Sequence, residues 1–393
     1  MLRSIYNSIK ESGFLILFFF ITLSLNHSFG YLTLIALFTI MCFFMITIKK
    51  RTINKQEVLI ILFLITYALF SSLNNHTYKS PTVILYFIAP FFFYQFGEYV
   101  AHRYKSNNAF VLFWFIVVLL YSFDTFYFSI ESIISSGQII GTDINNRTLE
   151  FESAGKSFSM SATNVGLAMD IAMVGLPMLF IENNNKRRLA FAILFLLGLA
   201  TTLHMINRTG LIIAVLCLLT IIAYRYKKNI FALLFSIFLI FVTLYSLISF
   251  EIIDNDIISV YTERNDDLST AGNRTIRWSE AIIQLPLNPF GWSNGKTYYI
   301  HNMWLDIARI AGLIPFIILV YFSLKSFKDS FTLINKNQNS LSYLLLGLNV
   351  CFFMSCFVEP IVGGTHLLLY FMLWGFTSQI KRINLKNKVT TNS

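Results

Sequence analysis

Three residues in this chain carry side chains that could act on an anionic substrate. Arg208 lies at a tight turn between two apolar stretches, Arg274 opens an amphipathic stretch, and His301 directly precedes another apolar stretch. A guanidinium held beside a membrane usually faces the protein interior or a water-filled cavity, and it binds anions without losing its proton. An imidazole exchanges a proton near neutral pH. These residues form a candidate site if the fold brings them together.

The elements that must position these residues are membrane helices. The chain has 393 residues, of which 56% are hydrophobic and 13% charged, and its mean hydropathy is +0.64. A soluble domain carries about 25% charged residues, so this chain has too little polar surface to cover a water-soluble globule. The composition predicts an integral membrane protein.

Apolar runs of nearly the length that crosses a bilayer predict twelve transmembrane helices. The predicted spans cover residues 13–29, 30–48, 57–73, 82–100, 108–129, 162–181, 189–206, 209–224, 229–250, 301–323, 340–358 and 365–380. The predicted fold class is an all-α integral membrane protein, with residues 1–393 forming one polytopic domain. We expect no cleavable signal peptide, because the first apolar run continues into the second without a small-residue cleavage site.

The distribution of basic residues predicts the orientation of the chain. With a cytoplasmic N-terminus, 21 of the 30 lysines and arginines fall in the inner loops, and every inner loop is basic. This bias predicts that both termini are cytoplasmic. It also accounts for the net charge of +10 without a nucleic-acid partner, so the membrane bilayer is the expected environment.

Two outer segments, residues 129–162 and 251–300, are longer than the other loops. Long segments in a protein with otherwise minimal loops usually carry function. We therefore expect the chemistry on the outer face, with part of the site in the segment 251–300.

The second outer segment contains a predicted amphipathic helix over residues 273–285. Asn273 is the expected N-cap, and the proline-containing stretch 286–289 is expected to end the helix. Helical spacing places three apolar residues on one face: Trp278, Ile282 and Leu285.

Two interpretations of this helix stay open at the level of sequence. In the first, the helix lies on the membrane surface with Trp278 as an interfacial anchor, and its arginines meet lipid headgroups. In the second, Arg274 or Arg277 points into a cavity and holds an anionic group of the substrate. An ion pair with Glu280 is a further role for Arg277, because the two are three residues apart on a helix.

No metal or cofactor site is predicted. The six histidines are scattered, and the chain contains no HExxH, CxxC, Walker or GxGxxG pattern. The four cysteines lie within apolar spans, which favours roles as small buried hydrophobic residues over disulfides. They are Cys42, Cys217, Cys351 and Cys356.

Four further charged residues stand in or beside predicted spans. Asp306 and Arg309 are three residues apart in the tenth span, and their spacing predicts an ion pair within the helix. Asp170 and Glu359 are membrane acids that could bind acceptor sugars or pair with Arg208.

Several short motifs follow one another in a fixed order. They are Asn207-Arg208-Thr209-Gly210-Leu211, Gly272-Asn273-Arg274 with Trp278, Asn288-Pro289, His301-Asn302 and Gly312. In this order and topology they resemble the O-antigen ligase and polymerase superfamily of bacterial surface polysaccharide assembly. The resemblance covers residues 203–315 by motif and the whole chain by topology.

The resemblance implies a metal-independent glycosyltransferase of the bacterial cell inner membrane, with its active site facing the periplasm. The donor is a glycan on undecaprenyl diphosphate, and the acceptor is a sugar hydroxyl in lipopolysaccharide biosynthesis. Arg208 and Arg274 would bind the diphosphate leaving group, and His301 would act as general base or bind substrate. The further substrate-binding candidates are Arg277, Asn302, Trp278 and Glu359.

Polymerase and ligase differ in their acceptors. We favour O-antigen polymerase, because the outer segment of about 50 residues is compact and the chain is rich in Phe, Ile, Asn and Lys. A chain-length regulator is then a further expected partner. O-antigen ligase, which joins the polysaccharide to lipid A-core, is the alternative. A transporter or flippase is the second alternative, because twelve helices with both ends inside also suit that class.

Overall fold

The computed structural model describes most of the chain, in blocks separated by gaps. The described residues are 13–25, 31–48, 53–74, 81–104, 106–140, 148–153, 156–227, 229, 231, 274–292, 300–359 and 364–391. They form α-helices joined by turns, with one two-stranded β-hairpin. The chain groups into two compact units, and each unit is described separately.

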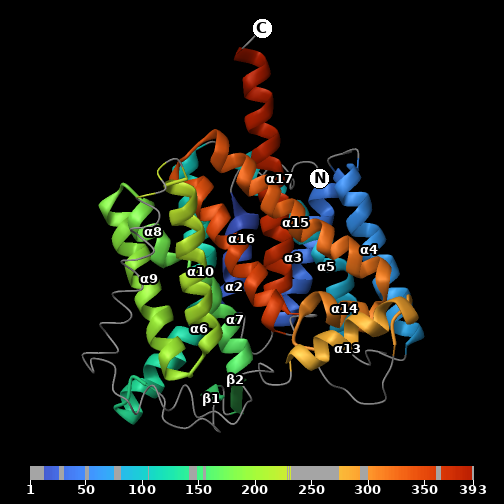
Figure 1. Ribbon diagram of the computed structural model, residues 1–393, viewed down its shortest axis with the longest axis horizontal. Helices are drawn as coiled ribbons and strands as arrows, with labels where there is room; N and C mark the ends of the chain where they lie inside the picture. Colours follow the sequence, from blue (N-terminus) through green and yellow to red (C-terminus); the bar gives the residue numbers. More distant parts are fainter. Residues whose placement is uncertain are drawn as a thin grey trace. The chain divides into compact units, whose positions relative to one another are not determined.

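The first unit comprises residues 1–121, 273–338 and 356–393. Its helices, labelled in Figure 1, are α2 (Phe14–Ser24), α3 (Tyr31–Ile48), α4 (Lys55–Leu73), α5 (Pro81–Arg103), the first half of α6 (Asn107–Ser136), α13 (Arg274–Leu287), α14 (Met303–Ala311), α15 (Leu313–Lys336) and α17 (Thr365–Thr391).

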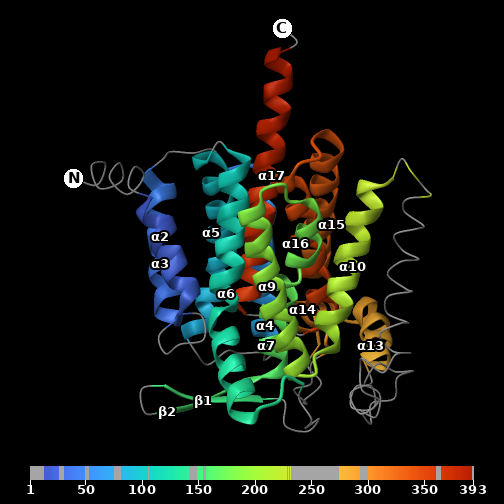
Figure 2. The same ribbon diagram turned by 90° about the vertical axis from the view of Figure 1, so that its left-hand side faces the viewer.

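The centre of the first unit is the contact between α5 and α17, which Figure 2 shows running alongside each other. A Cβ on Gly97 would collide with the backbone oxygen of Met372, and a Cβ on Gly375 would collide with that of Tyr94. Glycine therefore allows the two backbones to approach closely, as at small-residue contacts between membrane helices. Helices α4 and α15 pack against this pair and against each other.

The second unit comprises residues 122–272 and 339–355. Its elements are the second half of α6, β1 (Thr148–Ser153), β2 (Lys156–Ser161), α7 (Ala162–Ala172), α8 (Gly175–Ile181), α9 (Asn185–His204), α10 (Arg208–Arg225) and most of α16 (Ser340–Val358). The strands pair antiparallel with Thr148 opposite Ser161. The predicted outer segment 129–162 thus contains the end of α6 and this hairpin.

Five helices in the described part of the chain are long and apolar enough to cross a membrane: α4, α6, α9, α10 and α16. They support the prediction of a helical integral membrane protein. The count of twelve spans and the orientation of the termini stay predictions. The ninth predicted span, 229–250, lies almost entirely outside the described residues.

Two predicted spans are interrupted in the structure. The span 162–181 is divided into α7 and α8, because Pro177 has no N–H for the carbonyl of Met173. That carbonyl accepts from the N–H of Leu176 at 3.2 Å instead. The span 301–323 is divided into α14 and α15 at Gly312, whose φ of 81° lies outside the helical range.

Candidate functional site

Helix α13 confirms the predicted amphipathic helix in the second outer segment. It begins at Arg274 and ends at Leu287, with Pro286 in its last turn. The helix therefore extends two residues beyond the predicted end at Leu285 and includes Pro286. The predicted N-cap, Asn273, lies outside the described residues.

The two faces of α13 differ from the predicted ones in one residue. Ala281 and Leu285 are buried and Trp278 is half-buried, whereas Ile282 is 60% exposed. The apolar residues turned away from the protein are Ile276, Ile282, Ile283 and Leu287. A helix with one apolar face on the protein and a second apolar face exposed suits a position at a membrane surface.

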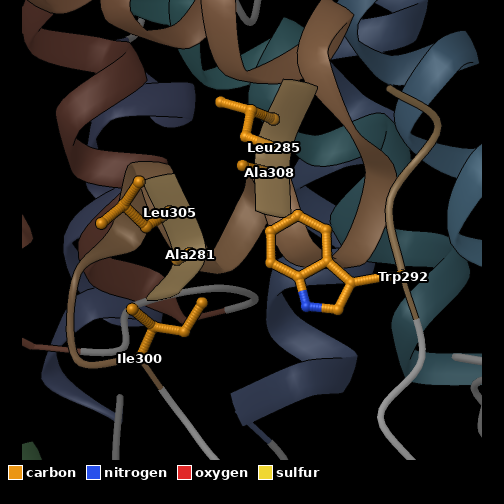
Figure 3. Packing of buried hydrophobic residues seen from close by; sticks show 6 residues of the cluster. All are labelled: Ala281, Leu285, Trp292, Ile300, Leu305 and Ala308. Atoms are coloured by element: carbon orange, nitrogen blue, oxygen red, sulfur yellow. The ribbon is translucent and has the colours of Figure 1, made fainter. Parts of the chain in front are cut away.

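An apolar cluster joins α13 to α14. Its buried members, shown in Figure 3, are Ala281, Leu285, Trp292, Ile300, Leu305 and Ala308. Ala281 and Leu285 come from α13, and Leu305 and Ala308 come from α14. The cluster fixes α13, which begins at Arg274, relative to α14, which His301 closely precedes.

Gly312 ties the segment after α13 to the end of α14. Its φ of 81° and ψ of −164° lie in a region that is almost exclusive to glycine. The chain on either side of it makes two backbone hydrogen bonds to that segment: Leu313 N–H donates to Pro289 O at 2.8 Å, and Trp292 N–H donates to Arg309 O at 2.8 Å.

Asn74, directly after α4, closes the same junction from the other side. Its Nδ2 donates to Phe290 O at 2.6 Å and to Ile310 O at 3.3 Å. One amide therefore links the segment after α13, the end of α14 and the end of α4. The sequence gives no sign of this role, because an Asn after a helix is an ordinary helix terminus.

Arg274 and His301 meet at one carboxylate, that of Glu359. Arg274 Nη2 lies 3.4 Å from Glu359 Oε1, and His301 Nδ1 lies 3.7 Å from Glu359 Oε2. The Glu359 side chain is 11% exposed, whereas those of Arg274 and His301 are 26% and 28% exposed. A buried anion thus holds two cationic or titratable groups that still reach the surface.

His301 and Glu359 lie close to each other without forming a hydrogen bond. At 3.7 Å the two atoms are beyond hydrogen-bonding distance, and both His301 Nδ1 and Glu359 Oε2 are buried without a hydrogen-bond partner. A buried ring nitrogen and a buried carboxylate oxygen therefore face each other without satisfying each other.

The backbone around His301 is held in an unusual conformation. His301 has a φ of 58°, in the left-handed region that residues other than glycine seldom adopt. Next to it, the N–H of Ile300 donates to Asp306 Oδ1 at 3.0 Å, and the carbonyl of Ile300 accepts from Trp278 Nε1 at 3.0 Å. These bonds hold the backbone directly before His301, and strain of this kind is concentrated at functional sites.

Asn302 supports His301 from the other side. Its Oδ1 accepts from Leu305 N–H at 3.1 Å and caps α14, and its Nδ2 donates to Phe357 O at 3.1 Å. These contacts connect the start of α14 to the chain just before Glu359. Asn302 and Trp278, both predicted to bind substrate, thus make contacts that position His301.

The predicted ion pair between Asp306 and Arg309 is confirmed. Arg309 Nη2 lies 3.7 Å from Asp306 Oδ1, and both side chains are buried. The same oxygen of Asp306 accepts the N–H of Ile300. The pair therefore stabilises both α14 and the residue that precedes His301.

Arg208 lies in the second unit, as the first residue of α10. Asn207 caps this helix, because its Oδ1 accepts from Thr209 N–H at 3.0 Å and from Gly210 N–H at 3.4 Å. The buried Asp170 has a carboxylate oxygen 3.5 Å from where a Cβ on Gly210 would lie. A buried acid is therefore close to the first turn of α10.

The structure thus brings two of the three predicted catalytic residues together, Arg274 and His301. The membership of Arg208 in the same site stays a prediction. Arg277 is half-buried one helical turn after Arg274, and its predicted contact with phosphate also stays a prediction.

The described residues contain no group of three or more His, Cys, Asp or Glu side chains placed to hold a metal ion. The four cysteines are all described, and each is a buried thiol that forms no disulfide, as expected for small hydrophobic residues. No family model matches the chain, and no curated protein matches it.

Proposed function

We propose that this protein is a membrane glycosyltransferase that moves a glycan from a lipid diphosphate to a sugar hydroxyl, as an O-antigen polymerase in lipopolysaccharide biosynthesis. The observation that supports the proposal most is the meeting of Arg274 and His301 at the two oxygens of Glu359. Such a transfer needs a group that stabilises the leaving diphosphate and a group that accepts the hydroxyl proton. An arginine and a histidine provide these two functions.

In the proposed reaction, His301 accepts the proton of the acceptor hydroxyl on Nε2, because Nδ1 faces Glu359. The hydroxyl oxygen attacks the anomeric carbon of the donor, and the bond from that carbon to the diphosphate oxygen breaks. The diphosphate leaves with the bonding electron pair. Glu359 stabilises the imidazolium that forms, as a buried carboxylate does beside a histidine base.

Arg274 has the complementary role in the proposal. Its guanidinium offers several N–H donors to phosphate oxygens in a planar, forked arrangement. Its contact with Glu359 Oε1, 3.4 Å long, is made by Nη2, so the other guanidinium nitrogens offer donors for a substrate anion. Arg208 is proposed as the second arginine for the diphosphate, on the basis of its motif at the start of α10.

The proposal is tested with purified protein and undecaprenyl diphosphate-linked repeat units, by following elongated glycan on a gel. We expect transfer to fall about 10²–10³-fold in Arg274→Ala and about 10²–10⁴-fold in His301→Ala. Arg187→Ala is the matched control, because Arg187 is 25% exposed and pairs with the buried Glu182 at 3.1 Å. Undiminished transfer in both site variants would refute the proposal.

The acceptor is tested separately in cells. Disruption of an O-antigen polymerase leaves lipopolysaccharide capped with a single repeat unit. Disruption of a ligase leaves lipid A-core without any repeat. The gel pattern of lipopolysaccharide from a deletion strain therefore separates the two acceptors, and we expect the single-repeat pattern.

A further inference from the structure

A second group of charges lies in the first unit, at the other end of α4 from the junction of α13 and α14. Asn74, after the last turn of α4, contacts the junction of α13 and α14, whereas Lys55 begins the helix. The 19 residues of α4 span about 28 Å at 1.5 Å per residue. A bilayer has a hydrocarbon core of about 30 Å, so about one membrane thickness separates the two places.

A cavity of about 280 Å³ opens beside the start of α4. Four basic residues line it: Lys55, Lys325, Lys381 and Arg382. They come from three helices, α4, α15 and α17. One carboxylate, that of Asp329, lines the cavity with them. The positive charge therefore converges on one cavity from elements that are far apart in the sequence.

Buried carboxylates offset only part of this charge. Asp329 forms ion pairs with both Lys325 and Lys381, at 2.5 Å for Lys381. Arg382 forms an ion pair with Glu98, which is fully buried. Glu57, in the first turn of α4, is a third buried carboxylate at this place. Three anions thus face four cations, which leaves one positive charge in excess. The exposed Lys55 adds its charge at the N-terminus of α4, where the helix dipole is also positive.

We propose that this cavity binds the phosphate of an anionic phospholipid headgroup. Like charges converging at one place repel one another unless an anion joins them, and a phosphate with several acceptor oxygens meets both lysine and arginine donors. Basic pockets between membrane helices at the bilayer surface recognise anionic headgroups in this way. The assignment does not depend on the proposed glycosyl transfer.

The test uses the full chain in nanodiscs of phosphatidylcholine with increasing phosphatidylglycerol, and bound lipid is counted by native mass spectrometry. Each lysine near an anionic membrane surface contributes about fivefold to binding, so Lys55→Gln with Lys381→Gln should weaken retention of phosphatidylglycerol by about 25-fold. Asp329 keeps Lys325 as its partner in this variant. Lys328→Gln is the matched control, because Lys328 is an exposed lysine of α15 outside the cavity lining and should change retention less than twofold.

A single variant and a competition with inorganic phosphate complete the test. Lys55→Gln alone removes an exposed side chain without breaking an ion pair with a buried carboxylate, so it should fold normally and still lose about fivefold in retention. Displacement of the lipid by inorganic phosphate would also support a phosphate-binding cavity, and it would show that soluble phosphate can occupy it. Equal retention of phosphatidylglycerol by wild type, Lys55→Gln and the double variant would overturn the proposal.

Discussion

Gly312→Ala should destabilise the junction that holds α13 against α14. The φ of 81° and ψ of −164° at this position are adopted almost only by glycine, and forcing another residue there costs about 1–3 kcal/mol. An added Cβ would also lie 2.6 Å from Phe290 Cα and collide with Pro289 O. Because these are backbone atoms, the segment after α13 must move as a whole.

That movement breaks the hydrogen bond from Leu313 N–H to Pro289 O, which is 2.8 Å long and worth about 1 kcal/mol. Together, the backbone strain and the lost hydrogen bond should lower the free energy of unfolding by about 2–4 kcal/mol. Because the junction holds the end of α14 against the segment after α13, Gly312→Ala should also displace α14 and lower glycan transfer, since His301 closely precedes this helix and would move relative to Arg274.

The assay is thermal unfolding of the purified protein in detergent, beside the transfer assay. Gly13→Ala is the matched control, because Gly13 also has a positive φ, 68°, and nothing lies within 4 Å of an added Cβ. Gly13→Ala should lower the free energy of unfolding by only about 1–2 kcal/mol, the cost of placing a residue with a Cβ in the left-handed region. An unfolding midpoint for Gly312→Ala equal to that of Gly13→Ala, with normal transfer, would refute the role of the junction.

Three other variants test separate contacts. Gly375→Ala should lower the unfolding midpoint by the equivalent of about 1–3 kcal/mol, because a Cβ there meets the backbone oxygen of Tyr94; an unchanged midpoint would contradict the close contact of α5 and α17. Trp278→Phe removes the indole donor to Ile300 O, and kcat for transfer should fall about fivefold with little change in KM, whereas a change in KM alone would indicate substrate binding by the indole. Asp306→Asn leaves a buried arginine charge without its anion, so the midpoint should fall by the equivalent of about 3–5 kcal/mol, and wild-type stability would show that the pair is dispensable.

The sequence predicts the elements of the candidate site better than their contacts. The amphipathic spacing and the prolines identify α13 to within a few residues, and the spacing of Asp306 and Arg309 identifies their ion pair. Both features are local, within one or two helical turns. The partner of Arg274 is not local, since Glu359 lies 85 residues away, and apolar periodicity carries no information on which helix ends meet.

The sequence also does not predict that the span 301–323 is interrupted at Gly312. A glycine within an apolar run is compatible with a continuous helix, and its φ of 81° follows from the tertiary bonds of the segment 289–292. In the sequence, the orientation of the chain in the membrane is enough to account for three basic residues of the cavity: Lys325, Lys381 and Arg382. Only the packing of α4, α15 and α17 shows that they share one cavity.

The central claim is that Arg274, Glu359 and His301 act as one site. Its most direct test is a double-mutant cycle of glycan transfer under single-turnover conditions with His301→Ala, Glu359→Gln and the double variant. If Glu359 acts through His301, Glu359→Gln lowers the rate in the wild-type background and has little further effect once His301 is absent, because residues that act as a unit are not additive. Equal losses from Glu359→Gln in both backgrounds, or no loss in either, would contradict the claim.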